Sequence, residues 1–418
     1  DYDELVTQCH QKKMTILLDL VLNHSSDDHP WFKRCLNAHK NHQVNNQYYN
    51  YYNVIELKSG ESVPAGYTKS GNFAYESRFW SGMPDLNLQN VLDEPNGFLA
   101  TEIKDIFKFW LVDHNIDGFR LDAVTSYFTG DEQRNLAFLT WLNTECKKLK
   151  SNCYIVGEGS WGTPTENQRY QASGCDSFFE FNNQSAKGYV ASVVMGDASF
   201  VSYALKKNKE IAADGIESPF VANHDTGRMI GCVKGRSDVN NLKFGHGILG
   251  MLNGTTYTYY GDEIGLAMPS TSDQRDEDKR LPMNFGDEYT PKPVYTASNY
   301  SESDVYPYGS VKDQEKDKNS VLNYVKKANL LRKQFKSIAR GKFETLFTSQ
   351  DDSFTAISKT YEDEEILILI NASNFKSYEF DYSSTKFNTP MAELCVEGNA
   401  KLKGSKIEVP KQGIVILK

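Results

Sequence analysis

The stretch Gly118-Phe-Arg-Leu-Asp-Ala-Val124 decides the fold that we expect for this chain of 418 residues. We predict that it is a strand, and apolar residues three or four apart predict helices on both sides of it, over 99–111 and 136–149. A strand between two helices is the repeating unit of a parallel sheet or barrel. The same rhythm continues in both directions from this stretch.

Further helices are predicted over 3–13 and 320–335, and further strands over 15–22, 154–157, 176–181, 219–222 and 255–260. This α/β alternation predicts a (β/α)8 TIM-type barrel. Residues 25–97 are rich in Asn, Tyr, Ser, Gly and Pro without a sustained helical period, so we expect them to form an inserted subdomain. After residue 340 the pattern changes to short strands separated by turns. We therefore predict a catalytic barrel over 1–338 that includes the subdomain 25–97, followed by an antiparallel β-sandwich over 339–418.

Composition excludes several classes of protein. Lys and Arg number 46 against 55 Asp and Glu, for a net charge of −9, which argues against nucleic-acid binding. The longest apolar runs fall far short of the roughly 20 residues that span a bilayer, so no membrane span is predicted. The seven cysteines are scattered without zinc or redox spacing and are expected to be ordinary thiols. No Gly-rich phosphate loop of known spacing appears, which argues against a nucleotide-binding barrel.

Acidic residues follow one predicted barrel strand after another: Asp19, Asp122, Glu158, Asp225 and Asp262. Barrel enzymes place their catalytic groups at these strand ends. Any single acid could instead cap a helix or lie in a solvated loop. Several that face one barrel mouth would repel one another unless a ligand or cation makes use of them, so we interpret them as an active site.

Two of these acids suit opposite roles. Arg120 and Asp122 are two residues apart on a strand and share one face, so the guanidinium would keep Asp122 ionised. Glu158 ends a buried strand without a basic neighbour in the sequence, so it can stay protonated as a general acid. An ionised carboxylate beside a protonated one is the pair that cleaves glycosidic bonds.

Six motifs in this order resemble the α-amylase family of retaining α-glucanases. They are Asp19-Leu-Val-Leu-Asn-His24, Gly82-Met-Pro-Asp-Leu-Asn87, Gly118 to Val124, Val156-Gly-Glu158, Val221-Ala-Asn-His-Asp225 and Tyr259-Tyr-Gly-Asp-Glu-Ile-Gly265. One such motif would be weak evidence, but six in order over essentially the whole chain are highly specific.

The resemblance implies a role for each site residue. Asp122 matches the nucleophile, Glu158 the general acid/base and Asp225 the carboxylate that stabilises the transition state. The substrate-binding residues that it implies are His24, Arg120 and His224, and we add Arg228, which could contact substrate or Asp225 or be solvated. The implied partner is an α-glucan or maltooligosaccharide, and we expect a monomer.

Two departures from the family pattern stand out. The strands found resemble only the third to the eighth of the barrel, so the first two βα units are expected to be missing and the inserted subdomain follows the third strand. No cofactor is expected to be required. Calcium is left open, because Asn23 resembles a family calcium ligand but Thr125-Ser126 replaces the family's Lys-His, and one oxygen is far from the six to eight that calcium takes.

Linkage and mode of action stay open at this point. Ala123 follows the predicted nucleophile and favours α-1,4 over α-1,6 bonds, by resemblance. The alternative is an α-glucosidase or transglycosylase on short α-glucosides, and a non-catalytic relative is disfavoured because all three carboxylates are retained. Aromatic residues that could stack on glucose rings or serve the core are Trp31, Phe79, Trp80, Trp161 and Tyr260. The cell compartment is unknown, although a polymeric substrate favours export.

Overall fold

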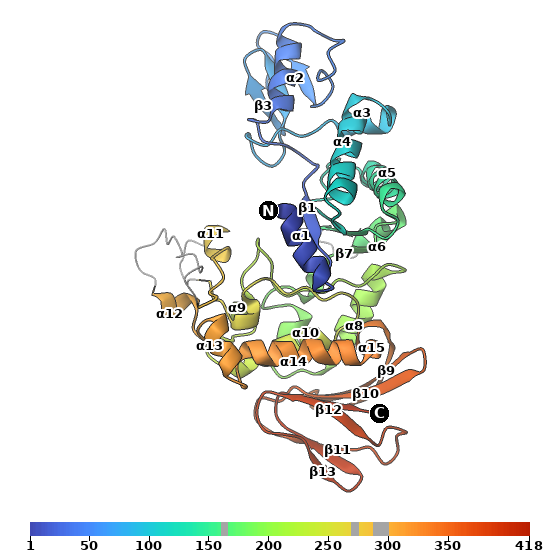
Figure 1. Cartoon of the computed structure of the whole chain (residues 1–418), viewed down its shortest axis with the longest axis vertical. Helices are drawn as coiled ribbons and strands as arrows, with labels where there is room; N and C mark the ends of the chain where they lie inside the picture. Colours follow the sequence, from blue (N-terminus) through green and yellow to red (C-terminus); the bar gives the residue numbers. More distant parts are fainter. Residues whose placement is uncertain (160–165, 269–275, 287–300) are drawn as a thin grey trace. The chain divides into compact units, whose positions relative to one another are not determined.

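The computed structural model describes residues 1–159, 166–268, 276–286 and 301–418. The chain divides into two compact units, residues 1–179 with 213–215, and residues 180–212 with 216–418 (Figure 1). These units do not coincide with the predicted domains 1–338, 25–97 and 339–418, whose bounds stay predictions. We describe each unit by itself.

The first unit is built on a parallel sheet. Its strands β1 (Leu17–Leu20), β5 (Gly118–Leu121), β6 (Tyr154–Gly157) and β7 (Ser177–Phe178) are neighbours in chain order. The register pairs Asp19 with Arg120 and Leu121 with Gly157. Because all four strands run the same way, the residues that follow them lie at one edge, and this edge carries the candidate site.

Helices α1 (Tyr2–Gln11), α4 (Phe98–Lys108), α5 (Glu132–Leu149) and the short α6 (Glu166–Tyr170) belong to the same unit. In α4, Leu99, Ile103 and Phe107 recur every four residues, so they share one face, and all three are fully buried. Each such side chain contributes about 1.5–3 kcal/mol by leaving water. The helix continues as a π-helical turn over Phe109–Asp113, which ends two residues beyond the predicted range 99–111.

The inserted segment 25–97 contains its own small sheet and two helices. Strands β2 (Val54–Glu56), β4 (Phe73–Glu76) and β3 (Tyr67–Ser70) pair antiparallel in that order, and α3 (Leu88–Asp93) leads back to the barrel helices. Although the sequence shows no sustained helical period here, the segment forms helices as well as strands. Helix α2 (Pro30–Lys40) buries Phe32, Cys35 and Ala38, and Pro30 in its first turn was the available sequence signal.

The second unit combines helices with two β sheets. Its longer helices are α8 (Ser199–Ala212), α10 (Val239–Met251) and α14 (Val321–Gln334). The shorter ones are α7 (Tyr189–Val194), α9 (Met229–Cys232), α11 (Asp276–Lys279), α12 (Glu302–Val305), α13 (Val311–Lys316) and α15 (Lys336–Arg340). The strands predicted over 219–222 and 255–260 appear as parallel bridges, Glu180 with Pro219 and Phe220 with Tyr257.

The chain ends in an antiparallel β structure. One sheet has the order β12-β15-β10-β9-β8 and the other β11-β14-β13. Their strands are β8 (Lys342–Thr348), β9 (Phe354–Tyr361), β10 (Glu364–Asn371), β11 (Tyr378–Asp381), β12 (Pro390–Cys395), β13 (Lys401–Lys403), β14 (Lys406–Val409) and β15 (Gly413–Leu417). The short strands predicted after residue 340, over 353–358, 365–369, 378–382, 406–409 and 413–417, are confirmed as β9, β10, β11, β14 and β15.

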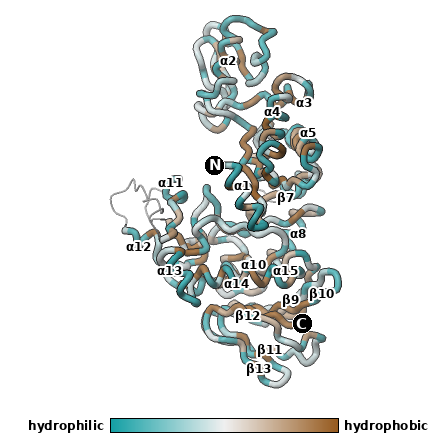
Figure 2. The backbone as a smooth tube through the Cα atoms, viewed as in Figure 1, coloured by the Kyte–Doolittle hydropathy of each residue, from teal (hydrophilic) through white to brown (hydrophobic). Residues whose placement is uncertain are grey.

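Strand β10 shows why these predictions succeeded. Leu367 and Leu369 join the core between the two sheets, whereas Ile366, Ile368 and Ile370 face the core that α10 and α14 share. Both faces are buried, so the strand is continuously apolar, as Figure 2 shows along β10. Strands β8, β12 and β13 escaped prediction because Leu394 is the one buried residue among them, so no apolar run marks them.

No helix in the described ranges is both long and apolar enough to cross a membrane.

Candidate active site

Arg120 organises the candidate site in the first unit. It lies on β5, and its Nη1 donates to Asp122 Oδ1 at 2.5 Å and to Asp19 Oδ1 at 2.9 Å. Its Nη2 donates to Glu158 Oε2 at 2.6 Å. One guanidinium therefore holds three acids from neighbouring strands: Asp19 within β1, Asp122 directly after β5 and Glu158 directly after β6.

The cluster is shielded from water except at Asp19, whose side chain is 53% exposed. Glu158 is buried, and Arg120 and Asp122 are only partly exposed. Burial alone would lower the pKa of Arg120, but the charges of Glu158, Asp19 and Asp122 raise it well above its ordinary value. The expectation that Glu158 has no basic partner does not hold in space, because Arg120 reaches it from the neighbouring strand. Sequence adjacency could not show this contact.

His24 is held at the end of β1 by the inserted segment. It forms an antiparallel bridge with Asp85, and Asn23 donates from Nδ2 to Asp85 Oδ1 at 3.3 Å. Burial lowers the pKa of His24, while the charge of Asp122 acts in the opposite direction. A half-buried, neutral histidine next to the carboxylates can hydrogen-bond a sugar hydroxyl.

The contribution of Asp85 to the free energy of unfolding should depend on pH. Burial raises the pKa of Asp85 to about 6, although the N–H bond from Arg78 opposes the shift. The unfolded carboxyl titrates near 4, so between about pH 4 and 6 the folded protein binds more protons and stability falls as pH rises. Asp85→Asn should be about 1 kcal/mol less stable than wild type at pH 4, for one lost hydrogen bond. This deficit should shrink as the pH rises to 6, because the variant lacks the carboxyl whose raised pKa makes the wild type lose stability over this range.

Urea unfolding of both proteins at pH 4, 5, 6 and 7 measures this difference. Other titrating groups are common to both proteins, so the difference between their free energies of unfolding isolates Asp85. Parallel curves for wild type and variant would contradict the prediction.

The second unit holds the remaining predicted residues. His224 Nε2 lies 3.1 Å from Asp225 Oδ2, and Arg280 Nη2 donates to Asp225 Oδ1 at 3.1 Å. Lys279 Nζ donates to the Asp225 carbonyl at 2.9 Å. Arg280 and Lys279 were not predicted as site residues, because nothing in the sequence links them to Asp225, more than 50 positions earlier.

Arg228 is placed differently from the solvated arginine that was one expectation. Its side chain is only 1% exposed, and it donates to the carbonyl of Tyr260. Its guanidinium lies 4.1 Å from the ring centre of Tyr259 and 3.7 Å from a carboxylate oxygen of Asp262. Burial raises the pKa of Asp262 to about 7 against the attraction of Arg228. Contact between Arg228 and substrate stays a prediction, and the burial of its side chain opposes it.

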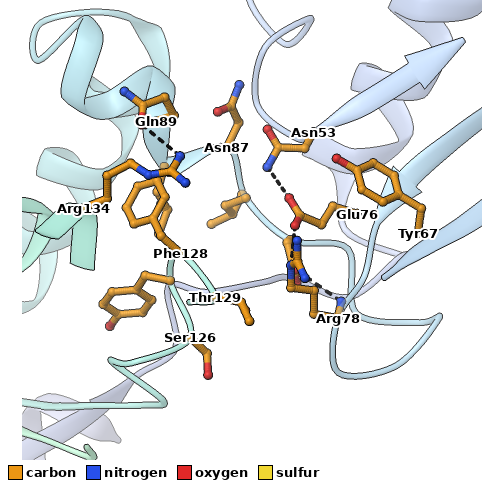
Figure 3. A pocket seen from close by; sticks show the side chains of 14 residues that line it. Asn53, Tyr67, Glu76, Arg78, Asn87, Gln89, Ser126, Phe128, Thr129 and Arg134 are labelled. Carbon is orange, nitrogen blue, oxygen red and sulfur yellow. Dashed lines mark hydrogen bonds and ion pairs between the residues drawn. The ribbon is translucent and has the colours of Figure 1, made fainter. Parts of the chain in front are cut away.

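A polar pocket of about 370 Å³ lies in the first unit, between the inserted segment and the segment after β5. Figure 3 shows Phe128 and Arg134 on one side of it and Glu76 and Arg78 on the other. Arg78 forms an ion pair with Glu76, and Arg134 forms one with Asp131, so a carboxylate already balances the charge of each arginine. The described residues that line the pocket include none of the predicted catalytic or substrate-binding residues.

The aromatic residues proposed for stacking differ in exposure. Phe79 and Trp80 are exposed, Trp31 is partly buried against Tyr51, and Tyr260 is bonded through its hydroxyl to the carbonyl of Leu281. Trp161 lies outside the described residues.

Within the described ranges no three His, Cys, Asp or Glu side chains come together as metal ligands would. Asn23, the expected ligand, uses its amide to donate to Asp85. Calcium binding stays a prediction, since calcium also takes backbone and amide carbonyl oxygens.

Two carboxyl groups on one guanidinium, at the carboxyl ends of parallel strands, are an arrangement suited to a barrel enzyme that cleaves glycosidic bonds. The model of the α-amylase catalytic domain matches residues 1–341. The chain therefore belongs to the α-amylase family. It is a glycoside hydrolase of α-glucans with a TIM barrel and a C-terminal antiparallel β domain.

Relatives support this assignment over the whole chain. α-Amylase 3 of Dictyoglomus thermophilum is 29% identical, over 100% of this chain and 79% of the relative. An oligo-1,6-glucosidase of Parageobacillus thermoglucosidasius is 26% identical, over 89% of this chain and 77% of the relative. Among solved structures, Eubacterium rectale Amy13B matches with a TM-score of 0.87 and 31% identity, over 100% of this chain and 81% of its own. An α-amylase from H. orenii shares the fold, with a TM-score of 0.78 at 24% identity over 100% of this chain and 82% of its own.

Proposed function

We propose that the protein hydrolyses α-1,4-glucosidic bonds in starch, glycogen or maltooligosaccharides with retention of configuration. The observation that carries the proposal is the bridge from Arg120 to both Asp122 and Glu158. A retaining pair needs carboxyl groups about 5–5.5 Å apart, whereas an inverting pair needs about 6.5–9.5 Å to admit a water molecule. Two carboxyl groups that share one guanidinium suit the closer spacing.

The reaction proceeds in two steps. Glu158 protonates the glycosidic oxygen while Asp122 attacks the anomeric carbon, and the leaving sugar departs from a covalent glycosyl-enzyme. Glu158, now ionised, removes a proton from water, which attacks the same carbon and releases the α product.

The other predicted residues bind the sugar and balance its charge. In this proposal Asp225 opposes the developing oxocarbenium charge, and His24 and His224 donate hydrogen bonds to hydroxyls of the same glucosyl unit. Arg280 and Lys279 support this assignment because they hold both the carboxylate and the carbonyl of Asp225. Arg228 positions the Tyr259–Tyr260 segment, and any contact of its own with substrate is secondary.

The chain organisation is part of the proposal. The catalytic barrel spans 1–338 with the subdomain 25–97 inserted after its strand β1, and a β-sandwich spans 339–418. We propose a monomer that binds no nucleic acid.

The second candidate is an α-glucosidase or transglycosylase that acts on short α-glucosides with the same residues. It is favoured by relatives such as the oligo-1,6-glucosidase of Parageobacillus thermoglucosidasius. α-Amylase 3 of Dictyoglomus thermophilum and Ala123 after the nucleophile favour the first candidate.

Proton NMR of maltoheptaose during digestion tests the proposal. We expect α-anomer signals to appear first, together with mid-sized products, because a double displacement retains configuration. Initial β-anomer signals would contradict the retaining mechanism. Glucose alone, or products longer than the input, would support the second candidate, and no cleavage by folded protein would reject both.

A further inference from the structure

The loop Phe79–Met83 exposes an unusual group of apolar side chains. Phe79 is 50% exposed, Trp80 65% and Met83 36%, and all three lie within five consecutive residues. Exposed apolar residues scattered singly are normal in soluble proteins, but a group of them, two of them aromatic, marks a binding surface. This loop connects β4 to the segment that holds His24.

The backbone of the loop is fixed along its length. The carbonyl of Trp80 accepts a hydrogen bond from Met83 N, that of Ser81 from the Tyr75 hydroxyl and that of Gly82 from Asp27 N, at 2.7–3.0 Å. Just after the loop, the carbonyl of Pro84 accepts a hydrogen bond from Ser25 N at 3.1 Å. The aromatic residues are therefore presented on a rigid support, which lowers the entropy cost of binding a ligand.

The ring of Trp80 packs against the backbone at Gly82. A methyl group at Gly82 would lie within 2.8 Å of three carbon atoms of the Trp80 six-membered ring. Gly82 therefore lets the indole lie against the backbone, and most of the side chain still faces solvent. A residue with a Cβ at position 82 would have to displace the indole.

The loop also reaches the candidate active site. The ring of Phe79 lies 5.3 Å from the ring of His24, centre to centre. The negative charge of Asp122 in turn acts to raise the pKa of His24, against the effect of burial. The aromatic pair thus begins beside the predicted sugar-binding histidine and continues to the exposed indole one residue further along.

We infer that Phe79 and Trp80 form a stacking platform for a glucosyl unit of the substrate other than the one at which cleavage occurs. The inference rests on the proposed function and adds a chain-length requirement to it. Sugar rings present C–H faces that pack on aromatic rings, and a neutral platform suits an uncharged glucan. A protein partner is disfavoured, since a stable interface buries about 800 Å² on each side and the group has three exposed residues.

Kinetics on substrates of two lengths test the platform. For Trp80→Ala we expect the ratio of kcat/KM for maltoheptaose over that for maltotriose to fall about tenfold relative to wild type, because the longer chain loses the stacking contact. Gly82→Ala should lower the same ratio in the same direction, since it displaces the indole without removing it. Phe98→Ala is the matched control: Phe98 is 63% exposed at the start of α4, and its loss should leave the ratio unchanged.

Calorimetric titration separates this inference from the proposed function. In the Asp122→Asn background, which should bind but not cleave, adding Trp80→Ala should raise the Kd for maltoheptaose about tenfold. An unchanged ratio and an unchanged Kd would overturn the platform while leaving the proposed function intact. An equal loss on both substrates would also overturn it, because it would mean that Trp80 supports the fold of the site. Failure of Asp122→Asn to bind any glucan, with wild type inactive, would reject the proposed function and the platform with it.

Discussion

Asp122→Asn should lower kcat for maltoheptaose by about 10⁴-fold or more, the order of loss that follows removal of an essential group in a covalent mechanism. The amide is nearly the same size as the carboxylate, so the hydrogen bond from Arg120 can be kept while the nucleophile is lost. KM should change much less than kcat. Release of reducing ends, measured with enough enzyme to detect very slow turnover, gives the rate.

Two further measurements make this test specific. Thermal unfolding should show that the variant is folded, and Asp113→Asn, which alters an exposed acid paired with Lys108, should keep wild-type activity. More than a few percent of wild-type rate in Asp122→Asn would reject Asp122 as the nucleophile. A smaller variant, Asp122→Gly, with added azide should regain some turnover and give a product of inverted configuration, because the small anion attacks in place of the carboxylate.

Arg120→Lys should lower kcat/KM by about 10³-fold, of the order found when a single preorganised donor to a transition state is removed. Lysine keeps the positive charge but lacks the planar fork, so it cannot hold Asp122 and Glu158 through two nitrogens at once. The two acids lose their fixed relation, and both steps of the reaction depend on that relation. Steady-state kinetics on maltoheptaose measures the loss.

Arg120→Met separates charge from geometry. Without any cation, Asp19, Asp122 and Glu158 repel one another, so this variant should also lose about 3 kcal/mol in the free energy of unfolding. Arg134→Lys, a change at an arginine bonded to an exposed acid in the same unit, should keep activity and stability. If Arg120→Lys keeps activity within tenfold of wild type, the bridge is not required for catalysis.

Much of the fold could be predicted because its signals are local. Strands β5 and β6 and helices α4, α5 and α14 were located from apolar spacing within a few residues of their observed bounds. Helix α2 was missed because its buried face is short and its other residues are polar. The strands over 219–222 and 255–260 are reduced to single bridges, since apolar pattern predicts burial better than it predicts regular pairing.

The candidate site was predicted as a set of residues but not as a set of contacts. Asp122 and Arg120 lie two apart on one strand, so their contact follows from strand geometry alone. Glu158 reaches the same guanidinium only because β6 pairs in parallel with β5. The burial of Arg228 and the exposure of Trp80 likewise depend on what packs around each side chain.

By itself, the sequence determined the order of strands and helices, the acids that follow the strands and the family to which the chain belongs. These properties depend on short stretches in which spacing and residue type are enough. Tertiary structure decided which acids share a cation, which arginine is buried and which tryptophan is exposed to solvent. Arg120 meets Asp19 across 101 positions of the chain and Glu158 across 38, and only the register of the parallel sheet brings such distant residues together.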